Sequence, residues 1–162
     1  MTLAKQQPKK VRPPMDCGEA GAYKDLQKKT GQGLLDRDHV PSKSALKEAA
    51  RKIAAKLRPP VTLTDAMKST ITALADTIAI PKPLHQGHSA TYGGRSDPET
   101  DAKNLNKAAK RDLDEIQEHW GKHDPDCAEA YAEAADEIRA KIDDNPDYYK
   151  KWLTDIIKGK IK

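Results

Sequence analysis

The chain is organised around the stretch Leu34-Leu35-Asp36-Arg37-Asp38-His39-Val40-Pro41-Ser42. Because a proline disfavours helical backbone at the residue before it, this stretch is predicted to be a strand ending near Val40. Ser42 is a good N-cap and predicts a helix directly afterwards. A second stretch follows some way along the chain, and it reads Ile78-Ala79-Ile80-Pro81-Lys82-Pro83-Leu84-His85-Gln86-Gly87-His88. It predicts another short strand with two histidines behind it, and we expect the two stretches to fold together into one site.

The remainder of the chain predicts helices. Residues 18–29 are expected to form a short helix, and apolar residues recur at helical spacing in 43–57 and 63–74. Three Asp-Pro or Asn-Pro pairs, at 97–98, 124–125 and 145–146, are strong helix starts in the C-terminal half. The first of these helices is expected to run to about Gly121. The predicted fold class is therefore mainly α with a small β element.

Length and composition indicate one domain with a thin core. The chain has 162 residues, no phenylalanine and a formal net charge of +4. Residues 1–17 are polar, basic and contain prolines, so they are expected to form a tail or linker before a single domain at 18–162. Cys17 and Cys127 lie far apart, which argues against a cysteine zinc site and leaves a disulfide open. No apolar run is long enough to span a membrane, and no signal peptide is visible.

Positive charge gathers in the first part of the chain. Residues 1–58 carry 14 Lys and Arg against 6 Asp and Glu, which fits a polyanionic ligand as well as an ordinary lysine-rich surface. The predicted helix after Ser42 supplies the candidate phosphate contacts, which are Lys43, Lys47, Arg51 and Lys56.

Asp38 and His39 are the first candidates for chemistry. The imidazole of His39 has the right ordinary pKa to take a proton from water near neutral pH. Asp38 offers oxygen ligands suited to Mg²⁺, Mn²⁺ or Zn²⁺. Neighbouring strand residues point to opposite faces, so a bend at Pro41 would be needed to bring both side chains to one site. His85 and His88 add two imidazoles, and one Asp with two His around an ion is the stoichiometry of a catalytic centre.

These motifs resemble the HNH/His-Me finger nuclease toxins, the ββα-metal endonucleases at the C-termini of bacterial polymorphic and secretion-system toxins. The resemblance covers about residues 21–95. It rests on Gly21-x-Tyr23-x-x-Leu26, the stretch Asp36 to Ser42, Ile78-x-Ile80-Pro81 and His85-x-x-His88-x-x-x-Tyr92. It implies a ββα-metal core with a helical insert and C-terminal helices.

The same resemblance implies a function. His39 matches the general base, Asp38 the metal-binding residue before it, and His85 or His88 the ligand at the helix start. Arg37 or Arg95 is expected to clamp the scissile phosphate, and Tyr92 to stack on a base. The implied activity is metal-dependent hydrolysis of DNA with low sequence specificity, in a toxin that is secreted or injected into target cells and paired with an immunity protein.

Two alternatives stay open at this point. One is an RNase toxin in which the histidines work as acid and base without metal. The other is a helical adaptor or nucleic-acid-binding module that is not an enzyme, with the histidines in structural positions.

Overall fold

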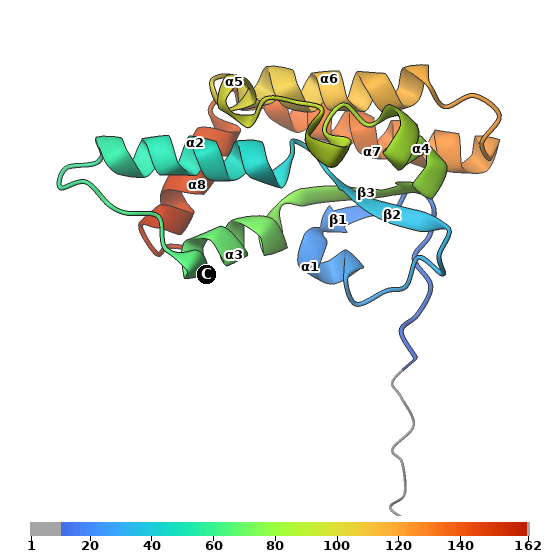
Figure 1. The fold of residues 1–162 in the computed structure, drawn as a ribbon, viewed down its shortest axis with the longest axis horizontal. Helices are drawn as coiled ribbons and strands as arrows, with labels where there is room; N and C mark the ends of the chain where they lie inside the picture. Colours follow the sequence, from blue (N-terminus) through green and yellow to red (C-terminus); the bar gives the residue numbers. More distant parts are fainter. Residues whose placement is uncertain (1–10, 162) are drawn as a thin grey trace, which may run out of the picture.

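The computed structural model describes residues 11–161 and shows a small sheet surrounded by helices (Figure 1). The prediction of a mainly helical chain with a small β element is confirmed. In chain order the elements are β1 (Ala20–Ala22), α1 (Tyr23–Leu26), β2 (Leu35–His39), α2 (Lys43–Lys56), α3 (Asp65–Leu74), β3 (Asp76–Pro81), α4 (Lys82–His88), the 3₁₀ turn η1 (Tyr92–Gly94), α5 (Pro98–Ala102), α6 (Leu105–Glu118), α7 (Pro125–Asp144) and α8 (Tyr148–Ile157).

The sheet has the strand order β1-β3-β2, and both outer strands run antiparallel to β3. Both expected strands form, and the register pairs Asp38 with Ile78 and His39 with Thr77. The sequence does not predict the third strand, β1, since a helix is expected over residues 18–29. Its three residues, Ala-Gly-Ala, carry no strand signal of their own. They are extended because they pair with the strongly buried β3.

Side-chain caps set the helix starts that the sequence predicted. The Ser42 hydroxyl accepts a hydrogen bond from the backbone N–H of Ala45 at the start of α2, and the Thr64 hydroxyl caps α3. The long helix expected after Asp97 is divided into α5 and α6. Asn104 leaves the helical conformation and caps α6 by accepting a hydrogen bond from the N–H of Lys107.

The core lies between the sheet and the C-terminal helices. Ile78 and Ile80 of β3 are fully buried and belong to one cluster with Leu113 of α6 and Tyr131 of α7. Since alanine lets helices approach closely, the alanines on these helices compensate for the missing phenylalanines. Within residues 11–161, no helix is both long and apolar enough to cross a membrane.

The segment just before β1 is attached to the domain. Met15 is buried and its N–H donates to the carbonyl of Thr30 at 2.8 Å. Cys17 forms a disulfide with Cys127 of α7, with Cα atoms 5.2 Å apart. The structure therefore differs from the expectation of a tail up to residue 17. The expectation for residues 1–10 lies outside the described part of the chain.

Candidate metal centre

His85 stands between two carboxylates of β2. Because side chains alternate along a strand, Asp36 and Asp38 point to the same face. Strand β3 pairs with β2 and α4 follows it directly, so the chain returns His85 over that face. The Nδ1 of His85 donates a hydrogen bond to Asp36 Oδ2 at 2.8 Å, and its Nε2 lies 3.4 Å from Asp38 Oδ1. Three chemically active groups from two elements thus converge.

Burial shapes the electrostatics of this group. Asp38 is only 3% exposed. Burial lowers the pKa of His85, but the hydrogen bonds and negative charges of Asp38 and Asp36 outweigh it, so the net pKa is raised above its ordinary value. The imidazole is held as an ion-pair partner of both acids, and it can accept a divalent cation only after losing a proton.

The spacing of the two inner atoms fits a shared metal ligand set. Zinc binds nitrogen and oxygen ligands at about 2.0–2.2 Å, so two ligands at a tetrahedral angle lie roughly 3.4 Å apart. Octahedral ions of the Mg²⁺ type bring such ligands to roughly 3.0 Å of each other. His85 Nε2 and Asp38 Oδ1 are 3.4 Å apart. Asp36 meanwhile holds the other ring nitrogen, as the carboxylate behind a metal-binding histidine does. The residues present therefore fit a cation, and a tetrahedral one best.

Asp36 was missed as a site residue by sequence reasoning. The signal was available, because two acids at i and i+2 in a predicted strand share a face. The adjacent Asp-His pair drew attention to the wrong neighbour.

His39 lies on the opposite face of β2. Its ring packs against Tyr23 with centroids 4.5 Å apart, and its Nε2 is 3.3 Å from the carbonyl of Thr72. Burial lowers the pKa of His39, the hydrogen bond to Thr72 opposes this, and the charges of Lys43 and Lys47 lower it further. The expected bend that would unite Asp38 and His39 is absent, because β2 keeps its pairing with β3 as far as His39.

His88 also separates from His85. Along a helix, three residues turn the side-chain direction by about 300° and advance it by about 4.5 Å. His85 therefore reaches β2, whereas His88 stacks on His119 near the end of α6, with ring centroids 4.5 Å apart. The expectation that His85 and His88 share one ion with His39 opposite is thus not met by this arrangement.

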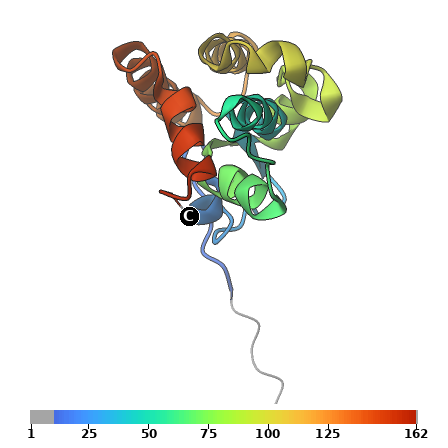
Figure 2. The same cartoon turned by 90° about the vertical axis from the view of Figure 1, so that its left-hand side faces the viewer.

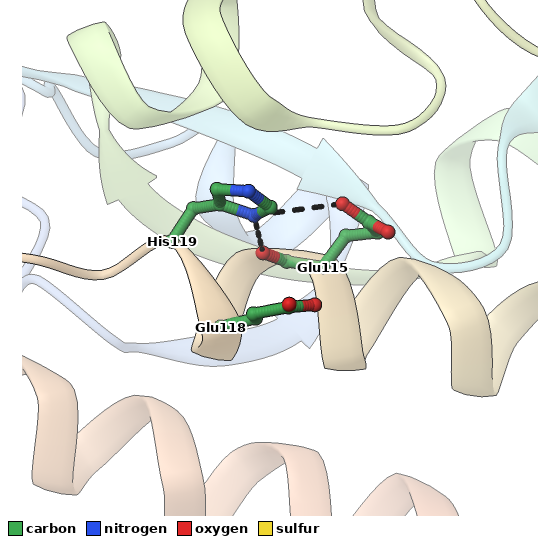
Figure 3. A group of neighbouring side chains, drawn as sticks. All are labelled: Glu115, Glu118 and His119. Atoms are coloured by element: carbon green, nitrogen blue, oxygen red, sulfur yellow. Dashed lines mark hydrogen bonds and ion pairs between the residues drawn. The ribbon is translucent and has the colours of Figure 1, made fainter.

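His119 belongs to a second group of metal-binding residue types, shown in Figure 3. Ligand atoms of Glu115, Glu118 and His119 all lie within 4.8 Å of one another. The Nδ1 of His119 donates to the backbone carbonyl of Glu115 at 2.9 Å and is 3.5 Å from its carboxylate. Two of the three residues are exposed. Because exposed carboxylates commonly gather on a helix without any ligand, we assign this group no function.

Neither candidate arginine faces the pair formed by Asp38 and His85. The guanidinium of Arg37 donates to the backbone carbonyls of Leu26 and Lys29. That of Arg95 donates to the carbonyls of Ser89 and Gln86, so it holds the loop after α4. Tyr92, which is 38% exposed, does stay at the site, because its ring meets the His85 ring edge-on with centroids 5.1 Å apart.

The basic residues of α2 divide between three environments. Lys43, Lys47 and Lys68 lie near one another, and burial followed by the charges of Lys43 and Lys68 lowers the pKa of Lys47. Arg51 is engaged with Glu48 at 2.6 Å, and Lys56 borders a separate groove between α2 and α8. Only Lys43 and Lys47 of the four expected phosphate contacts therefore remain clustered, on the face that also holds His39.

A buried acid lies behind the site. Asp112 of α6 is 3% exposed, accepts hydrogen bonds from Arg111, and has one oxygen without a partner among the described residues. Burial raises the pKa of Asp112 to about 7, and the charge of Asp38 contributes in the same direction. Asp38 therefore sits in surroundings where charge is weakly screened, which strengthens its attraction for a cation.

Comparison of this chain with protein-family models, with curated proteins and with solved structures finds no match.

Proposed function

We propose that this chain is a divalent-metal-dependent nuclease in which Asp38 and His85 hold the cation. The observation that carries the proposal is the 3.4 Å separation of His85 Nε2 and Asp38 Oδ1, with Asp36 bound to the other ring nitrogen. Histidine and carboxylate oxygens are ligands shared by Zn²⁺ and Mn²⁺, and the spacing favours the tetrahedral ion.

Each residue has a distinct task in this proposal. Asp36 keeps the proton on Nδ1 and so leaves Nε2 free for the ion. Asp38 supplies an anionic ligand. A bound divalent ion would stabilise the charge that develops on phosphorus and on the leaving oxygen. Tyr92 lies beside His85 and is partly exposed, so it is placed to contact the substrate.

The substrate assignment rests on charge and on the motif resemblance. Lys43, Lys47 and Lys68 form a cationic cluster suited to phosphates. The sequence carries no motif that reads base edges, which supports low sequence specificity. The resemblance favours DNA over RNA, and it also supports the toxin role, specialised delivery and an immunity-protein partner.

Plasmid cleavage tests the proposal directly. We expect nicking or degradation with Zn²⁺, Mn²⁺ or Mg²⁺, loss of cleavage in EDTA, and loss in Asp38→Asn and His85→Ala. His119→Ala is the matched control, since it removes an exposed imidazole outside the site. Metal-loaded wild-type protein that leaves plasmid and single-stranded RNA intact would refute the nuclease assignment.

His39→Ala tests the expected general base separately. Because the ring lies on the other face of β2, we expect metal affinity to be unchanged by this substitution. If cleavage is lost while metal affinity is intact, the proton transfer belongs to His39. If cleavage also persists, His39 has a structural role.

One observation favours a second candidate, a metal-independent RNase. The raised pKa of His85 between two acids suits a general acid that donates a proton near neutral pH. In that case RNA cleavage would survive EDTA and would still be lost in His85→Ala.

A further inference from the structure

A groove unrelated to the metal centre runs between three parts of the helical layer. Its floor is α2, α8 forms one wall, and the junction of α5 and α6 forms the other, as the end-on view of α2 shows (Figure 2). The groove has a volume of about 800 Å³. It exists because the chain breaks at Lys103 and Asn104, so that α5 turns away from the axis of α6.

The inside of the groove is apolar. Ile53 and Leu57 on the floor are only partly buried, although they pack against the main core. Leu105 and Leu153 line the walls. This apolar surface gains stability when a ligand removes it from water.

The rim carries one sign of charge. The groove is bordered by Lys52, Lys56, Lys103 and Lys150, and no Asp or Glu lines it. Lys52 has Glu48 at 3.9 Å. Within residues 11–161, no carboxylate lies within 4.0 Å of the ammonium groups of the other three. An anion at the rim would therefore meet ammonium groups that have no competing partner.

We propose that this groove binds an amphipathic anion, with an aliphatic chain on the floor and a carboxylate or phosphate head among the lysines. A nucleic-acid strand suits it less well, because no exposed aromatic ring offers a stacking surface and Tyr149 is only 4% exposed. A groove of this size and apolar lining is typical of a small-molecule site. The proposal is independent of the nuclease assignment.

Isothermal titration calorimetry with amphiphiles of one chain type tests it. Octanoate, decanoate and dodecanoate, used below their micelle concentrations, should bind with affinities that rise roughly fourfold per methylene. Dodecyl phosphate should bind as dodecanoate does. Inorganic phosphate should bind weakly and dodecyltrimethylammonium, with the same chain and the opposite charge, weakest. If affinity does not depend on chain length, or the cationic amphiphile binds equally well, the proposal is wrong.

Charge variants locate the site. The triple change Lys56→Gln, Lys103→Gln and Lys150→Gln should raise the Kd for dodecanoate roughly tenfold, because each exposed pair is worth a modest amount. The control carries the same loss of charge at Lys24, Lys28 and Lys122, which lie outside the groove, and should bind as wild type. Equal Kd values for the two variants, or no binding by wild type up to about 1 mM, would overturn the proposal.

Discussion

Replacing Asp36 by Asn tests the metal centre at its least obvious residue. The change keeps the size of the side chain and removes its charge from His85 Nδ1, 2.8 Å away. Both partners are mostly shielded from water, with side-chain exposures of 16% for His85 and 23% for Asp36. Losing the group that orients a metal-binding histidine typically costs 10- to 100-fold in metal affinity, which corresponds to about 1.4–2.7 kcal/mol. We expect Asp36→Asn to weaken Zn²⁺ or Mn²⁺ binding by that factor.

The pH dependence adds a second, opposite sign. In metal-free protein the folded-state pKa of His85 is raised, so its ion pairs stabilise the fold fully below about pH 6.5 and this contribution is lost as the pH rises through the raised value. Metal affinity should increase over the same interval, since the ion competes with the proton. In Asp36→Asn the folded pKa falls, and the midpoint of this increase should move to lower pH.

Calorimetric titration of the metal at several pH values measures both effects, and NMR of His85 in EDTA reports its proton directly. Asp143→Asn, which makes the same chemical change at an exposed residue paired with Lys110, is the control and should match wild type. An Asp36→Asn protein with an unchanged plateau affinity and an unchanged midpoint would show that Asp36 does not orient the ligand.

Three further results are expected. Reducing the Cys17–Cys127 disulfide, which spans 110 residues, should lower the thermal midpoint and destabilise the fold by about 2–5 kcal/mol, whereas an unchanged melt in dithiothreitol would contradict this. Lys43→Gln with Lys47→Gln should flatten the salt dependence of DNA binding in EDTA by up to about 0.9 log units per log unit of salt for every phosphate that these lysines no longer neutralise, and an unaltered slope would place the DNA elsewhere. The folded-state pKa of Asp112 is raised to about 7, so stability should fall as pH rises from about 4 towards that value, and Asp112→Asn should remove this part of a urea-midpoint profile.

Local features could be predicted from sequence where their cause is local. Ser42 and Thr64 start helices because their hydroxyls satisfy the first free N–H groups, and the proline after Val40 ends a strand for steric reasons. The break at Asn104 was missed because the helical pattern of apolar residues continues on both sides of it. Strand β1 was missed because Ala20–Ala22 is extended only through its pairing with β3.

The sequence by itself determined the helix-rich class, the two strands and the two stretches that meet, since each follows from backbone preference or periodicity. Which side chains share a site was decided only by tertiary structure. The register of β2 on β3 sends Asp36 and Asp38 to one face and His39 to the other, and α4 returns His85 to the acids rather than to His39. A partner 49 residues away along the chain is chosen by strand pairing and helix packing, and neither leaves a mark in the spacing of neighbouring residues.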